Sequence, residues 1–194
     1  GARPHFLLLS GTTLYVGSDG TEVDTYDAAT GAKIKVPFIS GIGSISGLTL
    51  SGNVLYVSDR SARKVDEYDA STGVLNTSFS VVGGAPYCLA VYGDHIFVAQ
   101  WGPGLGGQIS EYTLTGTPID LNFITTGYPG PFLLSGSTLY IGSLFNFPLQ
   151  LSGSTPTGGF GTIGKYNAAT GVGTSSFITG LNFPSGLAIT VPAP

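Results

Sequence analysis

One short turn motif recurs along the chain and constrains the fold more than any other feature. It reads YDAATG at 26–31, YDASTG at 68–73 and YNAATG at 166–171, with a degenerate copy, YTLTG, at 112–116. The Asp or Asn of each full copy can accept hydrogen bonds from backbone N–H groups two residues on, and its Gly can adopt a positive φ angle. These features are typical of a tight hairpin turn. The residues expected to form such structural turns are Asp27, Gly31, Asp69, Gly73, Asn167 and Gly171.

A second pattern gives the length of the repeating unit. A triplet of the Leu-Tyr-Val type recurs with its aromatic residue at 15, 56, 97 and 140, which gives spacings of 41, 41 and 43 residues. The turn tyrosines lie 42, 44 and 54 residues apart. A period of about 40–45 residues with four short strands, A to D, is typical of a β-propeller blade. We therefore predict an all-β, β-propeller-like fold with four blade repeats of about 41–54 residues plus one surplus A strand.

The second repeat shows where the strands of a blade are expected. Strands A to D of that repeat are predicted at 47–50, 54–58, 65–68 and 75–81, because short runs of strand-forming residues are separated there by turn residues. The approximate blade boundaries are 6–44, 45–85, 86–129 and 130–183, with an extra strand at 184–191. All of them belong to a single propeller-like domain over residues 1–194.

The A strands are uneven in number. Segments of the A type occur at 6–9, 47–50, 88–91, 132–134 and 186–189, five in all, against four each of types B, C and D. An unpaired strand edge invites pairing with another chain. Three arrangements stay open: the chain is a piece of a larger propeller, the last strand displaces the first from its place, or the surplus strand completes a neighbouring copy by β-augmentation.

Composition excludes some partners. Only 9% of residues are charged, against roughly 25% in an ordinary soluble domain. With a net charge of −4 and no basic stripe, the chain is not expected to bind nucleic acid. No run approaches the roughly 20 apolar residues of a membrane helix, so no membrane span is expected. The low charge suits an exported protein or one that packs against its own copies, and we expect the mature form of an extracellular or cell-surface protein.

Variable loops carry the candidate binding residues. The B–C loops are short in the first two repeats but long at 100–108 and 144–161, and loops of this kind on a rigid frame are where binding usually resides. Exposed aromatic and amide side chains suit carbohydrate stacking or a contact with another surface protein. The alternative is that the aromatic residues fold down and cap the end of the propeller. The candidate binding residues are Gln100, Trp101, Gln108, Phe145, Phe147 and Phe160.

Catalytic and metal-binding patterns are poor. His5 and His95 are the only histidines, and His95 lies in GDHIF, where a strand-start histidine is a better interpretation than a catalytic base. No His cluster or Cys pair has the spacing of a metal site. Asp19, Glu22 and Asp59 could line the face that carries the variable loops, but we predict no catalytic residue, metal or cofactor.

Two stretches resemble known repeats. LYVSDRSARKVDEYD at 55–69 resembles NHL and YVTN-type β-propeller repeats. YNAATG at 166–171, followed by SSFITGLNFPSGLAI, resembles blades of exported bacterial proteins that carry a PEP-CTERM sorting signal. The final VPAP is similar to the VPEP that opens such a signal, with Ala193 in place of Glu. The resemblance implies a propeller fold and export to the cell surface.

Two functional hypotheses follow. The first is a non-catalytic extracellular or cell-surface scaffold or interaction protein that assembles with itself, as a homo-oligomer or filament, through its terminal strands. The second is a small propeller enzyme of lyase or lactonase type with a metal at the channel mouth. Propellers with those activities place metal-binding or catalytic acids and histidines centrally, and no motif of theirs matches here.

Overall fold

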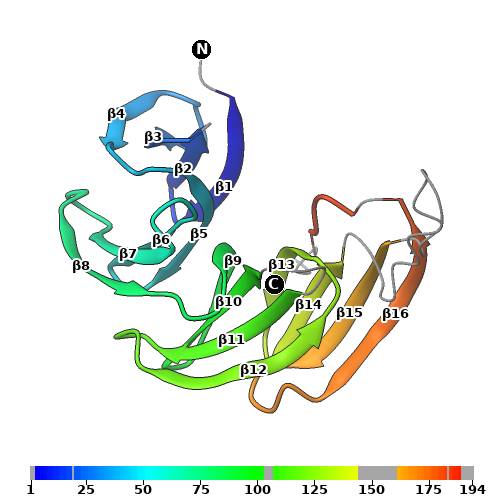
Figure 1. Cartoon of the computed structure of the whole chain (residues 1–194). Helices are drawn as coiled ribbons and strands as arrows, with labels where there is room; N and C mark the ends of the chain where they lie inside the picture. Colours follow the sequence, from blue (N-terminus) through cyan, green and yellow to red (C-terminus); the bar gives the residue numbers. More distant parts are fainter. Residues whose placement is uncertain (1–2, 19, 103–106, 144–160, 183, 189–194) are drawn as a thin grey trace, which may run out of the picture. The chain divides into compact units, whose positions relative to one another are not determined.

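A computed structural model describes residues 3–18, 20–102, 107–143, 161–182 and 184–188. Over these residues the regular secondary structure consists of sixteen β-strands and no helix (Figure 1). No helix there is long and apolar enough to cross a membrane. The predicted all-β class is therefore confirmed.

The described strands form four sheets of four, and in each sheet the strands pair in chain order as antiparallel hairpins. This is the topology of a propeller blade. The first sheet is β1 (Pro4–Ser10), β2 (Thr13–Ser18), β3 (Glu22–Asp27) and β4 (Lys33–Ile39). The second is β5 (Ile45–Ser51), β6 (Val54–Asp59), β7 (Lys64–Asp69) and β8 (Leu75–Ser80). The third is β9 (Ala85–Tyr92), β10 (His95–Trp101), β11 (Gly107–Thr113) and β12 (Pro118–Thr126), and the fourth is β13 (Pro129–Ser135), β14 (Thr138–Ser143), β15 (Gly161–Asn167) and β16 (Gly173–Leu181).

Equivalent strands share one register, which makes the blades comparable residue by residue. In the first blade Leu14 pairs with Tyr26, and in the second Leu55 pairs with Tyr68. The fourth blade repeats this with Leu139 opposite Tyr166. Because successive side chains of a strand point to opposite faces, equivalent residues lie on equivalent faces of their blades.

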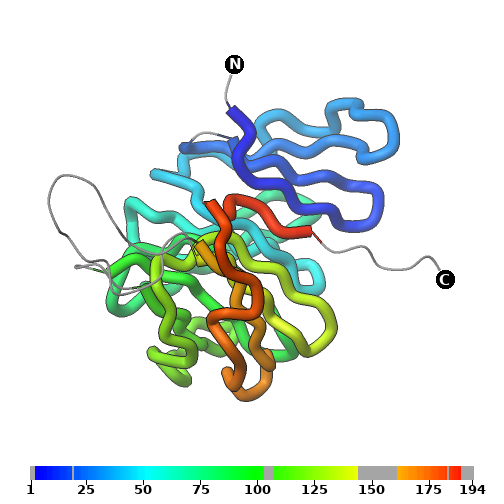
Figure 2. The backbone as a smooth tube through the Cα atoms, turned by 90° about the vertical axis from the view of Figure 1, so that its right-hand side faces the viewer, coloured from blue at the N-terminus to red at the C-terminus, as the bar shows by residue number. Residues whose placement is uncertain are grey.

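The predicted extra strand is not found over 184–188, the described part of 184–191. That segment follows β16 without forming a strand (Figure 2, red end of the tube). The reason is pairing: an A strand needs a B strand, and β2, β6, β10 and β14 already pair with β1, β5, β9 and β13. A fifth A-type segment therefore has no B strand left among the described residues.

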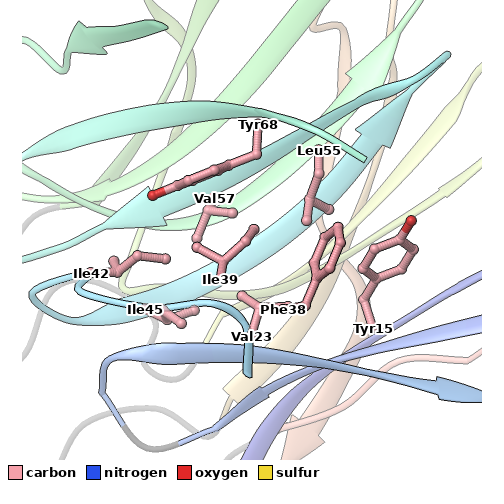
Figure 3. Close-up of a cluster of buried hydrophobic side chains, with 9 residues drawn as sticks. All are labelled: Tyr15, Val23, Phe38, Ile39, Ile42, Ile45, Leu55, Val57 and Tyr68. Atoms are coloured by element: carbon pink, nitrogen blue, oxygen red, sulfur yellow. The ribbon is translucent and has the colours of Figure 1, made fainter. Parts of the chain in front are cut away.

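The chain divides into two compact units, Gly1–Leu89 and Ala90–Pro194, with the division inside β9. The core of the first unit lies between its two blades (Figure 3). There the first blade contributes Tyr15, Val23 and Phe38, and the second contributes Leu55 and Val57. Burial of such apolar surface, at about 25 cal/mol per Å², is the main force that holds one blade to the next.

Candidate functional site

The repeated turn has the same hydrogen bonds in each full copy. Asp27 Oδ1 accepts bonds from the backbone N–H groups of Ala29 (3.1 Å) and Thr30 (2.7 Å) and from the Thr30 hydroxyl (2.7 Å). Gly31 closes the turn with φ of 71°. The Thr30 hydroxyl, and then its N–H, hold the pKa of Asp27 below its usual value. The turn is thus stabilised from within, as its sequence leads one to expect.

The second and fourth copies repeat this geometry. Asp69 accepts bonds from Ser71 and Thr72, chiefly through the Ser71 hydroxyl at 2.6 Å, which lower the pKa of Asp69 to about 2. In the fourth blade Asn167 Oδ1 accepts the same two backbone bonds, at 2.9 and 3.1 Å. Gly73 and Gly171 have φ of 75° and 67°.

Within the first unit, the turn of the second blade packs on a phenylalanine of the first blade. A Cβ atom added to Gly73 would lie 2.6 Å from the Phe38 carbonyl oxygen and 3.2 Å from its ring. Beside this contact, the Tyr15 hydroxyl donates to the Ala70 carbonyl at 2.8 Å. Burial, and then the Asp69 carboxylate, raise the pKa of Tyr15, which keeps this donor protonated.

A lysine completes the contact. The Lys35 ammonium lies 5.4 Å from the centre of the Phe38 ring and donates to the Thr72 carbonyl at 3.2 Å. The Tyr15 and Phe38 rings meet edge to face, 5.8 Å apart. We call this packing the turn–phenylalanine contact. In it, the turn of one blade lies on the aromatic pair and the lysine of the preceding blade.

The second unit contains the glycine-on-phenylalanine part of this contact. A Cβ atom added to Gly171 would lie 2.6 Å from the Phe123 carbonyl oxygen and 3.3 Å from its ring. The Phe123 ring stacks on Phe97 at 5.0 Å. Both units therefore pack the turn glycine of one blade on a phenylalanine of the preceding blade, but in the second unit Phe97 stands where Tyr15 supplies a hydroxyl in the first.

The outer face of the first blade is the half of this contact that receives no neighbour within the first unit. We call it the head face and define it by Leu7, Leu9, Leu14, Val16, Gly31 and Val36. A Cβ atom added to Gly31 would meet nothing within 4 Å. Leu14 and Val16 are only half-buried, whereas their equivalents Leu55 and Val57 are 0% exposed. The head face is built as a blade interface, but no other blade of the first unit covers it.

The head face is also hollowed. A groove of about 640 Å³ runs over it. Among the residues that line it are Leu7, Val16, Asp24, Tyr26, Lys33 and Val36. Asp24 Oδ1 is buried without a hydrogen-bond partner, whereas the equivalent Asp66 Oδ1 accepts from Ser78 at 2.6 Å. The groove therefore offers apolar surface together with an unsatisfied acceptor.

The outer face of the last blade is the opposite half of the contact. We call it the tail face and define it by Tyr140, Lys165, Phe177 and Ile178. Phe177 is 49% exposed, against 8% for its equivalent Phe38 in the first blade. The Tyr140 and Phe177 rings lie 6.1 Å apart, and the Lys165 ammonium lies 5.2 Å from the Phe177 ring. The aromatic pair and a cation are in place, and no turn of the second unit covers them.

The predicted loop site is only partly described. Gln100 is fully buried, and neither amide atom has a hydrogen-bond partner. Trp101 is half-buried, donates its indole N–H to the Pro129 carbonyl at 2.9 Å, and meets Tyr128 edge to face. Gln108 is half-buried and donates weakly to the Ser110 hydroxyl, at 3.4 Å.

Register brings Gln100 and Gln108 opposite each other on β10 and β11. The Trp101 indole bonds to the first residue of β13, the strand that opens the fourth blade. The other three candidates, Phe145, Phe147 and Phe160, lie outside the described residues. Ligand binding by this set stays a prediction.

A cavity in the first unit was not predicted from the sequence. It measures about 480 Å³. Its lining includes His5, Phe6, Ser18, Ser44, Arg60 and Tyr87. Burial raises the pKa of Tyr87, and the Arg60 guanidinium opposes part of that rise. These residues come from strands and loops up to 82 positions apart (5 to 87). Because the packing of the blades brings them together, the sequence alone does not predict the cavity.

His95, one of the two histidines, is paired with an acid. His95 Nδ1 lies 2.5 Å from Glu111 Oε1 on the neighbouring strand. In the described part of the chain, no three or more His, Cys, Asp or Glu side chains gather as a metal site would require.

Asp59, one of the acids considered from the sequence, acts as a loop anchor. It accepts bonds from the N–H groups of Gly43 (3.0 Å), Ser44 (3.3 Å) and Ala62 (3.0 Å) and from the Ser61 hydroxyl (2.8 Å). Burial raises the pKa of Asp59, but these bonds together outweigh burial and lower it. Its carboxylate oxygens are occupied by the two loops that it joins.

No family model matches the chain, and no curated protein matches it. Solved structures with a similar fold include a nidogen/laminin complex, with a TM-score of 0.74, 14% identity, and coverage of 94% of this chain and 66% of that one. The Pan2 WD40 domain of Neurospora crassa has a TM-score of 0.63 at 10% identity, covering 88% and 50%. The computationally designed Ika8 protein has a TM-score of 0.58 at 14% identity, covering 91% and 50%.

These likenesses show the fold. WD40 domains are β-propellers, and together with the sheet topology they establish that this chain consists of four β-propeller blades. The chain spans about half the length of the Ika8 and Pan2 chains that it matches. The finer resemblance to PEP-CTERM-associated blades stays a prediction.

Proposed function

We propose that this chain is a non-catalytic interaction scaffold, located outside the cell or on its surface, that assembles with copies of itself. The observation that carries the proposal is the pair of blade faces that no other blade of their own unit covers. Exposed large apolar side chains include Leu7, Leu9, Ile34 and Val36 in the first blade and Phe177 and Ile178 in the last. Contiguous exposed apolar surface is typical of a protein-interaction site.

Composition supports self-association and export. With 9% charged residues and a net charge of −4, little electrostatic repulsion opposes the approach of two copies. The low charge suits an exported protein, and the resemblance to exported bacterial blades favours the same location. A propeller frame is compatible with binding and with catalysis, so the proposal rests on the faces and not on the fold class.

Two routes to assembly are compatible with this function. In one, the segment that includes 184–188 pairs with a strand of a neighbouring copy, as expected from its A-type sequence. In the other, the blade faces left uncovered within their own units meet.

The proposal is tested by the mass of the native chain in solution. Size-exclusion chromatography with light scattering at micromolar concentration should give a species of two or more copies. A single copy over the whole accessible concentration range would contradict self-assembly. Localisation is tested separately, by fractionating the producing cells and probing intact cells with an antibody against the chain.

A further inference from the structure

We propose that the cavity of the first unit binds an acidic sugar, that is, a monosaccharide or disaccharide that carries a carboxylate. This inference goes beyond the proposed self-assembly and does not depend on it. The described residues that line the cavity, from His5 to Tyr87, all belong to the unit Gly1–Leu89, so the site is built by that unit alone. Its volume of about 480 Å³ is within the range of pockets that hold small ligands.

The cavity forms where one position of three successive A strands meets. His5, Ser46 and Tyr87 lie 41 residues apart, which is the spacing of the repeat itself, and they belong to β1, β5 and β9. In β1 and β5 the pairing register shifts at this position. Such a bulge changes the direction of a side chain and is frequent next to functional sites. The repeat therefore brings an imidazole, a hydroxyl and a phenol to one place.

Arg60 brings a permanent positive charge to this place. It follows Asp59, whose carboxylate accepts four hydrogen bonds from two loops and so fixes both of them. The Arg60 N–H donates to the Ser44 carbonyl at 2.8 Å, which holds the backbone of Arg60 at the cavity. Among the described residues that line the cavity, none is acidic. A guanidinium in such a position binds a carboxylate through two parallel N–H···O bonds.

Tyr87 is held in place from the second blade. The Ser46 hydroxyl donates to the Pro86 carbonyl at 2.8 Å, and the Ser58 hydroxyl donates to the Tyr87 carbonyl at 3.3 Å. Burial raises the pKa of Tyr87, and the Arg60 guanidinium is close enough to oppose part of that rise. The phenol is therefore a protonated donor near the guanidinium, and its ring offers an apolar face.

The rest of the wall favours a sugar over a simple anion. Phe6 and Ile45 add apolar surface, and Ser18 and Ser44 add hydroxyl groups. The C–H face of a sugar ring packs on an aromatic side chain, and its hydroxyls exchange hydrogen bonds with serine hydroxyls and with an imidazole. One carboxylate, an apolar face and several hydroxyls are the groups of an acidic sugar, and the cavity offers a counterpart for each.

The experiment compares two sugars that differ in one group. D-Galacturonate carries a carboxylate where D-galactose carries a hydroxymethyl group. Isothermal titration of the full chain should give an affinity for galacturonate about tenfold or more above that for galactose, the effect of a charged hydrogen-bonded pair. Arg60→Gln should remove this preference and leave the affinity for galactose unchanged. Tyr87→Phe keeps the ring and should weaken galacturonate binding by about two- to tenfold, the effect of one hydrogen bond.

A matched control separates the cavity from general attraction. Arg63→Gln removes the same charge from the same loop, at an exposed residue that is not among those lining the cavity. In about 0.15 M salt such a charge is screened, so this variant should bind galacturonate like the wild type. Circular dichroism should show the native spectrum for all three variants.

Four results overturn the inference. One is a wild-type chain that binds no galacturonate well above about 1 mM, the range of weak sites, as would happen if another part of the chain filled the cavity. The second is equal affinity for the two sugars, and the third is an equal loss of affinity in Arg60→Gln and Arg63→Gln. The fourth is inorganic phosphate that competes with galacturonate and binds as tightly, which assigns a general anion site. Binding is measured per chain, so a chain that fails to self-assemble leaves this inference intact.

Discussion

The turns at Gly73 and Gly31 are nearly identical in sequence and backbone, yet one is covered and the other is open. Both have positive φ. Both also follow an Asp whose side chain accepts hydrogen bonds from the residues two and three positions after it. Gly73 lies against Phe38 of the preceding blade, whereas Gly31 has no atom within 4 Å of an added Cβ. The comparison separates the part of a turn's structure that its own residues determine from the part that depends on the neighbouring blade.

The turn's own residues, Asp27, Thr30 and Gly31, form it in the first blade without a contact from another blade of the first unit. The neighbouring blade determines how deeply each residue is buried. Burial in turn determines how much a substitution there changes the free energy of unfolding. Equivalent substitutions in covered and uncovered blades therefore measure the blade–blade contact directly. The predictions below use such pairs, under conditions in which the chain is a single copy.

The largest difference is expected for the leucine of the B strand. Leu55→Ala should lower the free energy of unfolding by about 2–5 kcal/mol, because it opens a cavity in the fully buried core. Leu14→Ala, at the equivalent but half-buried position of the head face, should cost about 1 kcal/mol. Urea unfolding followed by tyrosine fluorescence checks both. Equal effects would mean that the head face is covered in solution.

The turn glycines should show the next largest difference. Gly31→Ala should cost about 1 kcal/mol, the strain of an Ala at positive φ. Gly73→Ala should cost about 2–4 kcal/mol, because its Cβ would also lie 2.6 Å from the Phe38 carbonyl oxygen and one blade must shift. Thermal unfolding measures both, and a smaller effect at Gly73 than at Gly31 would contradict the turn–phenylalanine contact.

Structure that depends on residues close together in the sequence could be predicted, whereas structure that depends on distant residues could not. The blades could be predicted because turn and register are local: strand A of the second blade was expected at 47–50 and is β5 at Ile45–Ser51. That 184–188 forms no strand could not be predicted, because an A-type segment pairs only where a B strand is free. The five A-type segments indicated one surplus strand but not which of the five it would be.

The candidate sites were harder to predict for the same reason. Aromatic residues in variable loops drew attention to Trp101, but its bond to Pro129 depends on the fourth blade's position. The head and tail faces carry the same residues as covered faces, so their sequences do not distinguish them.

The tyrosine hydroxyl gives a smaller and more selective comparison. Tyr15→Phe removes the bond to the Ala70 carbonyl and should cost about 1 kcal/mol, the net contribution of one hydrogen bond. Tyr140→Phe should leave the free energy of unfolding nearly unchanged, because no turn of the second unit covers this equivalent position. Chemical unfolding of the two variants measures the difference. A destabilised Tyr140→Phe chain would mean that its hydroxyl has a partner in the folded protein.

The smallest expected effect is the contribution of the turn aspartates to acid stability. The pKa of Asp69 is held at about 2, below the value of 3.8 that it has without its turn partners, so the folded chain binds its proton less readily than the unfolded chain. The sign follows from linkage: this stabilisation is fully present above about pH 4 and is lost as the pH falls toward about 2. Asp69→Asn should keep the turn, since Asn167 accepts the equivalent backbone bonds, but should flatten that part of the pH dependence. Asn167→Asp should introduce the same dependence in the fourth blade. Melting temperatures of the three proteins between pH 2 and pH 6 test this, and parallel curves would show that the charge of the turn residue does not contribute to stability.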